Sequence, residues 1–194
     1  MINRAVAMLA FTGLTLSCAG NAPAGPPMPA GLVSVTSHQV EQWVEATVRD
    51  SAPVRIRFQW NFRQETGNAS GRGSVWIVPP DTLRLDFRGP LGSGSSAAAV
   101  VGEQEVWAVP EEEVRKLVPS FPILWAMLGR ALAPLPGASL TGYSDALVTG
   151  WRAVSGIDTV DYVAARGGKD QLVADVRIDG ERLGRVVTTF DAAG

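Results

Sequence analysis

Strict alternation of apolar and polar residues over two stretches is the feature that most constrains the fold of this chain. From Val54 to Phe62 every second residue is large and apolar, and the residues between them are polar. The stretch from Leu83 to Phe87 repeats the pattern. Because side chains of a β-strand point alternately to its two faces, each stretch predicts a strand with one buried and one solvated face.

Further short strands are predicted along most of the chain. They cover residues 74–78, 97–101, 106–109, 146–148, 151–154, 158–164, 171–178 and 185–190. The polar residues from Arg63 to Gly73 are typical of turns and predict a loop between the first two strands. Asp179-Gly180 is the strongest hairpin signal in the chain. The order predicts antiparallel strands in succession.

Three segments have a helical period instead. Residues 37–48 place their apolar side chains on one stripe, with Ser37 as the candidate N-cap. Residues 110–117 open with proline and three glutamates, which suits the N-terminal end of the helix dipole. Residues Ile123–Leu132 are apolar nearly all round and too short to cross a bilayer. Such a helix is a core helix, a lid over an apolar cavity, or a membrane-surface helix, and the sequence leaves these three open.

The N-terminus has the pattern of a targeting signal. Arg4 precedes an apolar run from Ala5 to Leu16, and Ser17 and Cys18 follow. This predicts a signal peptide over residues 1–17. Leu14-Thr15-Leu16-Ser17-Cys18 resembles the lipobox of bacterial lipoproteins, which implies lipidation of Cys18, and Ala19 in the next position implies sorting to the outer membrane. The alternative is an ordinary cleaved signal whose cysteine is incidental.

The predicted organisation has two parts after the signal peptide. Residues 18–35 are the lipidated cysteine and a tether rich in proline and glycine. Residues 36–191 are a single folded domain.

The residues that carry chemistry are few. One cysteine and one histidine form neither an internal disulfide nor a His/Cys metal site. With 17 Lys+Arg, 19 Asp+Glu and a formal net charge of −2, the chain has no bulk attraction to nucleic acid. It contains none of the common catalytic motifs. We therefore predict a protein that is not an enzyme and has no metal or cofactor. A cluster of Asp, Ser and His38 in the fold would favour a hydrolase instead.

Two motifs resemble those of LolB-type outer-membrane lipoproteins, which belong with the LolA-like half-barrel carriers. They are Leu83-Arg84-Leu85-Asp86-Phe87-Arg88-Gly89-Pro90-Leu91-Gly92 and Trp125-Ala126-Met127-Leu128-Gly129. The order of elements from Ser37 to Phe190 is similar as well. The resemblance implies an α+β fold, a strongly curved antiparallel half-barrel (an incomplete β-barrel) with helices closing its concave side.

The same resemblance implies a function. The concave side would bind acyl chains of a lipid or a lipoprotein, and the protein would be a monomer anchored in the outer membrane by its own acyl chains, facing the periplasm. It would receive lipoproteins from a LolA-like periplasmic carrier and pass them to the outer membrane. The residues predicted to line the acyl cavity are Phe58, Trp60, Phe62, Ile77, Leu83, Leu85, Phe87, Leu124, Trp125 and Leu128.

One departure from the LolB pattern concerns the segment from Arg63 to Gly73. LolB-type proteins carry a protruding large apolar residue there, and this chain has none. This departure counts against insertion of cargo into the membrane and leaves the expectation of lipid binding unchanged. The alternative function is a structural or assembly lipoprotein with a solid core that binds a protein partner. A cavity between the sheet and the Ile123–Leu132 segment distinguishes the two.

Overall fold

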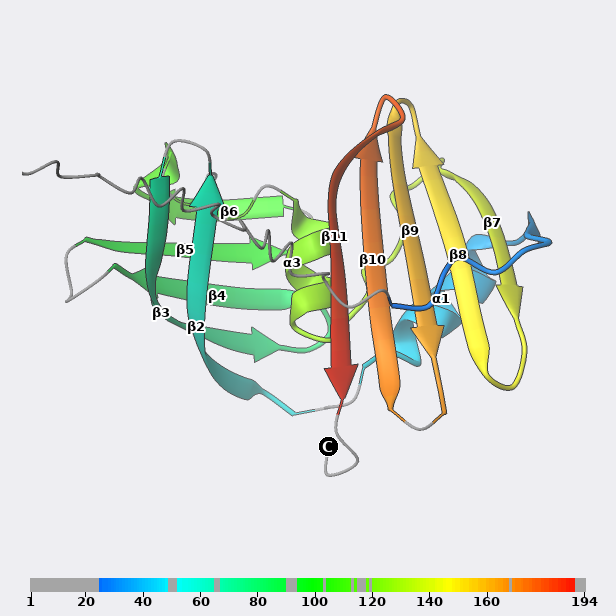
Figure 1. The fold of residues 1–194 in the computed structure, drawn as a ribbon, viewed down its shortest axis with the longest axis horizontal. Coiled ribbons are helices and arrows are strands. Elements are labelled where there is room, and N and C mark those ends of the chain that lie inside the picture. Colours follow the sequence, from blue (N-terminus) through cyan, green and yellow to red (C-terminus); the bar gives the residue numbers. More distant parts are fainter. Residues whose placement is uncertain are drawn as a thin grey trace, which may run out of the picture.

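Two antiparallel sheets make up most of the protein (Figure 1). The computed structural model describes residues 25–48, 52–64, 67–89, 94–102, 104–112, 114, 118, 120–167 and 169–190. The first sheet has the order β2-β3-β4-β5-β6, and the second has the order β1-β7-β8-β9-β10-β11. The predicted α+β class, rich in antiparallel sheet, is confirmed.

The first sheet is a meander of consecutive strands. Its members are β2 (Val54–Gln64), β3 (Gly67–Val78), β4 (Thr82–Arg88), β5 (Ser95–Val101) and β6 (Gln104–Val109). The alternation predicted for β4 is confirmed, because Leu83, Leu85 and Phe87 are buried while Arg84 is exposed.

The prediction of a loop from Arg63 to Gly73 is wrong. β2 and β3 pair without a break from Val54↔Ile77 to Gln64↔Gly67, so most of this segment is strand. Its glycines suggested turns, but Gly73 has a packing role, since the ring of Phe58 occupies the space that a Cβ would take.

The second sheet contains two strands that the sequence pattern did not predict, β1 and β7, and β1 falls within the predicted tether. The members of this sheet are β1 (Val33–Ser34), β7 (Ser139–Ser144), β8 (Val148–Ser155), β9 (Asp158–Ala165), β10 (Asp170–Ile178) and β11 (Glu181–Phe190). β7 was missed because its sequence, SLTGYS, has no strong apolar alternation. The predicted strand at 146–148 is wrong for residues 146 and 147, and β8 begins at Val148. The Asp145 carboxylate accepts the backbone N–H groups of Leu147 and Val148, each at 2.8 Å, and holds a turn before the strand.

The predicted hairpin at Asp179-Gly180 is confirmed. Both residues have positive φ, 51° and 79°, as a type I′ turn requires. This turn joins β10 to β11 and thereby fixes the edge of the second sheet.

The helices differ in their boundaries from the prediction. α1 (Ser37–Glu45) is capped by Thr36, whose hydroxyl accepts the N–H of Gln39, so the predicted Ser37 cap is wrong. α3 (Phe121–Met127) ends well before Leu132, because Gly129 adopts a φ of 81° and turns the chain away. In the predicted helix at 110–117, residues 111, 112 and 114 are helical and the rest lie partly outside the described residues.

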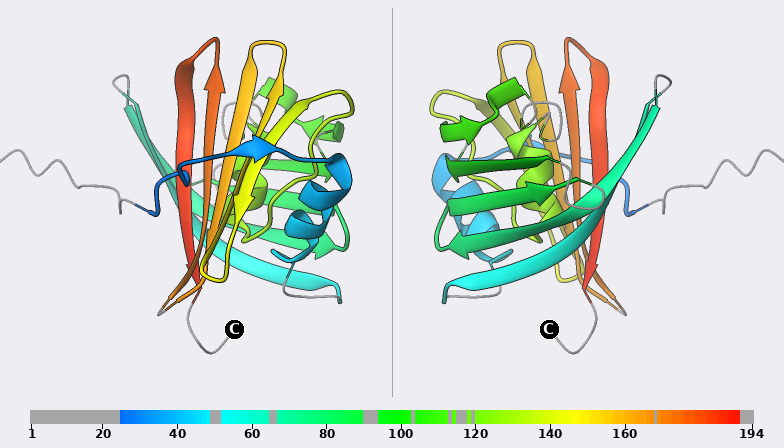
Figure 2. Two further views of the ribbon diagram at one scale, coloured as in Figure 1. Left: turned by 90° about the vertical axis from the view of Figure 1, so that its right-hand side faces the viewer. Right: turned by 90° about the vertical axis from the view of Figure 1, so that its left-hand side faces the viewer.

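The core lies between the two sheets, whose strands cross in the views of Figure 2, and α3 lies between these sheets in Figure 1. Leu124 and Trp125 of α3 pack on the inner face of the first sheet. Ala126 packs with Val40 of α1 and with Trp151 on the inner face of the second sheet. The short helix thus connects two hydrophobic clusters that the strands alone would leave separate.

Part of the predicted tether lies on the second sheet rather than free of the domain. Arg185 Nη2 donates to the carbonyl oxygens of Gly25 and Pro26, each at 3.3 Å, and β1 pairs with β7. The segment from Gly25 crosses the outer face of this sheet (Figure 1), where Pro29 contacts Gly150. Residues 1–24, including the predicted signal peptide and Cys18, lie outside the described residues.

This placement predicts an effect of the substitution Gly150→Val. A Cβ at Gly150 would lie 2.5 Å from Pro29 Cδ, so a valine must displace the N-terminal segment. We expect faster amide hydrogen exchange in residues 30–35 and a loss of about 1–3 kcal/mol of stability. Hydrogen exchange with mass spectrometry checks this, and unchanged exchange there would contradict the packing.

Candidate functional site

The residues predicted to line an acyl cavity are brought together in one cluster. One hydrophobic cluster, which we call the first-sheet cluster, lies between the inner face of the first sheet and α3. The predicted residues whose side chains are described belong to it or pack against it: Phe58, Ile77, Leu83, Leu85, Phe87, Leu124, Trp125 and Leu128. The side chains of Trp60 and Phe62 lie outside the described residues. Leu85 also lines a small pocket of about 150 Å³ with Val100 and Phe121. Most of this cluster is filled by the protein's own side chains.

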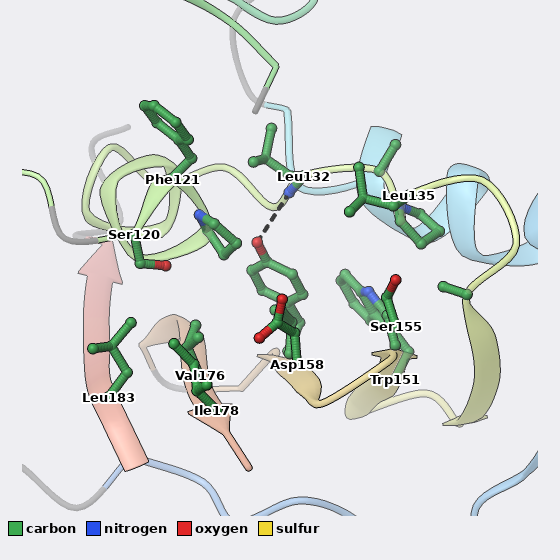
Figure 3. Close-up of a pocket in the computed structure, with 17 residues that line it drawn as sticks. Ser120, Phe121, Leu132, Leu135, Trp151, Ser155, Asp158, Val176, Ile178 and Leu183 are labelled. Carbon is green, nitrogen blue, oxygen red and sulfur yellow. Dashed lines mark hydrogen bonds between the residues drawn. The ribbon is translucent and has the colours of Figure 1, made fainter. Parts of the chain in front are cut away.

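A more apolar pocket lies against the second sheet. It has a volume of about 190 Å³ and lies between the inner faces of β8 to β11 and the segment from Ser120 to Ala138 (Figure 3). This segment contains α3 and the irregular chain that follows it. The pocket is therefore next to the predicted Ile123–Leu132 element, but on the opposite side from the predicted residues.

The floor of the pocket is aromatic and rigid. Trp151 and Tyr162 are almost fully buried, and their rings stack with centroids 5.2 Å apart. The backbone N–H of Leu132 donates to the Tyr162 hydroxyl at 3.3 Å, which is the dashed line in Figure 3. The ring of Trp43, on α1, also packs near Trp151, with the two ring centroids 6.1 Å apart. These contacts hold the two floor rings in fixed positions.

The rim of the pocket is apolar and open to solvent. Leu135, Ile178 and Leu183 line it and stay 48%, 40% and 43% exposed. Figure 3 shows Leu183 and Ile178 on one side of the pocket and Leu135 on the other. Apolar side chains thus line the pocket at its exposed rim and at its buried floor.

Polar groups are few and lie among the lining residues at Ser120, Ser155 and Asp158. The described residues contain no group of three or more His, Cys, Asp or Glu side chains that could hold a metal ion. His38 is exposed on α1, where its Nε2 lies 3.3 Å from Gln42 Nε2 and its Nδ1 lies 3.9 Å from Glu41. The site is built to hold an apolar group, and its polar atoms are suited to orienting one.

Comparisons of this chain with protein-family models, with curated proteins and with solved structures gave no match. Among the described helices, none combines the length and the hydropathy needed to cross a bilayer.

The pocket residues on the second sheet were missed as site residues, although their strands were predicted. Alternation through Val160 and Tyr162 on β9 and through Val176 on β10 placed these side chains on one face. The sequence pattern did not show that α3 ends at Met127. Because it ends there, the irregular chain that follows leaves space over this face of the second sheet. The exposed rim residues Leu135 and Leu183 lie outside any regular alternation and gave no signal.

Proposed function

We propose that this protein is a non-catalytic, lipid-anchored protein that binds the end of an acyl chain in the pocket between the second sheet and the 120–138 segment. The observation that carries the proposal is the apolar rim that leads into an apolar, aromatic floor. Burial of exposed apolar surface is favourable by about 25 cal/mol per Å², so an apolar chain gains by covering Leu135, Ile178 and Leu183.

The pocket volume sets the size of the ligand. At about 190 Å³ it is smaller than the roughly 300–1,000 Å³ of a drug-sized ligand site. It suits the terminal part of one chain, with the remainder lying along the rim. A flat, polar ligand would find few hydrogen-bond partners there.

The LolB resemblance supports a setting for this binding. In this proposal the two sheets form one curved, half-barrel wall with α1 and α3 on its concave side, and Cys18 carries the acyl anchor in the outer membrane. The protein would face the periplasm and exchange lipid or lipoprotein acyl chains with a LolA-like carrier. Residues 63–73 contain no large apolar residue of the kind that protrudes in LolB-type proteins. We therefore propose binding of acyl chains and not insertion of cargo into the membrane.

A structural or assembly lipoprotein is the second candidate. It is favoured by the first-sheet cluster, where the residues predicted for a cavity instead fill the interior. In that case the pocket would stay without an acyl ligand, and the outer surface would bind a protein partner.

A binding experiment with a fluorescent fatty-acid analogue tests the proposal. We expect the full chain to bind the analogue saturably and Leu183→Glu to weaken binding at least about tenfold, because the new carboxylate must lose water under the bound chain. Leu147→Glu is the matched control, since Leu147 is 66% exposed in the turn before β8 and does not line this pocket. No saturable binding, or equal loss in both variants, would refute the proposal.

A further inference from the structure

The outer face of the first sheet, opposite the core, concentrates positive charge. Its outward positions include five exposed arginines: Arg55, Arg57, Arg72, Arg84 and Arg88. Asp86 is the one acidic residue at the outward positions of the described strands here, and it lies 3.5 Å from Arg84. The whole chain has a formal net charge of −2, so this excess of arginine is a local property of the face.

The same face exposes large apolar side chains. These are Trp76, Val78, Val101, Trp107 and Val109, and together with the five arginines they define what we call the Arg/Trp face. Trp76 is 49% exposed and Val109 is 63% exposed. Contiguous apolar exposure of this kind marks an interaction surface rather than ordinary solvated sheet.

Strand register places the two kinds of residue side by side. The pairings Arg55↔Trp76, Trp76↔Arg84, Arg84↔Ala99 and Ala99↔Trp107 form a single row across all five strands. The guanidinium carbon of Arg84 lies 5.9 Å from the ring centroid of Trp107. Cations and indole rings therefore alternate on one surface, with valines in the neighbouring rows.

This combination selects the occupant by its chemistry. Arginine forms bidentate hydrogen bonds with phosphate, and tryptophan prefers the interface between an apolar phase and water. A single-stranded nucleic acid would satisfy the arginines and stack on the indoles, but it has no apolar layer to cover Val78, Val101 and Val109. A phospholipid bilayer offers both phosphates and an apolar layer below them.

We infer that the Arg/Trp face docks on the surface of a bilayer that contains anionic phospholipids. The inference goes beyond the proposed function, because it requires neither an acyl chain in the pocket nor acylation of Cys18. It gives the protein a second, peripheral membrane contact through its first sheet. A peripheral contact of this kind would fix which face of the anchored domain is turned to the membrane.

Vesicle binding tests the inference directly. Residues 18–194 carrying Cys18→Ala, which lack the apolar run of the predicted signal peptide and cannot be acylated, are mixed with vesicles of phosphatidylcholine alone or of phosphatidylcholine with phosphatidylglycerol. We expect binding to the vesicles with phosphatidylglycerol, weakened by added salt because exposed charges are screened. Quenching of tryptophan fluorescence by brominated lipid should accompany binding and be lost in Trp76→Gln/Trp107→Gln.

Charge variants distinguish this face from the rest of the surface. Arg55→Gln/Arg57→Gln should reduce vesicle affinity about fivefold for each arginine, roughly 25-fold in all. Arg166→Gln/Lys169→Gln removes the same charge from the connection between β9 and β10 and should change affinity less than about twofold. Each variant is also assayed for the fatty-acid analogue without vesicles, where no change is expected.

Three outcomes would overturn the inference. One is equal binding to both kinds of vesicle. Another is the same affinity in the Arg55/Arg57 variant as in its parent, which would assign binding to another part of the chain. The third is tight binding to single-stranded RNA without vesicle binding. Loss of analogue binding with intact vesicle binding would instead refute the proposed pocket and leave the docking face.

Discussion

Replacing Trp125 with alanine is expected to lower the free energy of unfolding by about 3–5 kcal/mol. Trp125 is 1% exposed and packs at the junction between α3 and the first sheet. Its Nε1–H donates to the carbonyl of Gly102 at 2.9 Å, which ties α3 to the turn between β5 and β6. The substitution removes a large apolar side chain and leaves that carbonyl without this donor, and both effects destabilise the fold.

Urea unfolding monitored by circular dichroism measures this effect. Trp76→Ala is the matched control, because it removes the same kind of side chain from a position on β3 that is 49% exposed. We expect the control to cost less than about 1 kcal/mol. Equal costs at the two positions would mean that α3 is not packed between the sheets as described.

The second large effect is expected for Asp161→Asn, which should cost about 2–3 kcal/mol. Asp161 is buried on the outer face of the second sheet. Arg152 donates to it through Nε at 2.6 Å and Nη2 at 2.8 Å, and Arg177 Nη1 donates at 2.8 Å. The hydrogen bond to Asp161 raises the pKa of Arg152. Asparagine keeps the shape of the side chain, but it removes the negative charge of the Asp161 carboxylate that faces the guanidinium groups of Arg152 and Arg177.

Two features hold the cost below the roughly 3–5 kcal/mol typical of a fully buried ion pair. The Arg152 and Arg177 side chains are 39% and 27% exposed, so water compensates part of the loss. Asp161 also lies directly opposite Asp175 in the ladder, and Arg177 bridges the two carboxylates, so the substitution relieves some repulsion.

Thermal and urea unfolding measure the loss, and Asp86→Asn is the control. Asp86 belongs to a single, exposed pair with Arg84 at 3.5 Å, so its loss should cost less than about 1 kcal/mol. A result in which both variants lose the same stability would show that the Asp161 cluster contributes no more than a surface pair.

The strands with clear alternation were predictable, and their physical basis is simple. Val54 to Phe62 and Leu83 to Phe87 must each place their apolar residues on one face, whatever the rest of the chain does. Glycine-rich segments were not predictable in this way. Gly73 and Gly150 serve close packing against Phe58 and Pro29, and a sequence pattern cannot distinguish that role from a turn.

The candidate site shows the same division. Inner-face positions such as Tyr162 and Val176 follow from period two, but the pocket depends on where α3 stops. Gly129 turns the chain there, so the residues that follow lie over the second sheet instead of continuing as a helix. The rim residues Leu135 and Leu183 come from segments far apart in the sequence, and only folding brings them to one opening.

Local features follow from the order of residues: which faces of the strands are apolar, where the hairpin at Asp179-Gly180 turns, and that one cysteine and one histidine are the available thiol and imidazole groups. Contacts between distant segments set where the apolar pocket between the second sheet and the 120–138 segment opens, and they gather Arg55, Trp76, Arg84 and Trp107 into one row. The physical reason is that alternation fixes the side of each residue within its own strand. Neighbours across the sheet are set by register and packing, which act between segments distant along the chain.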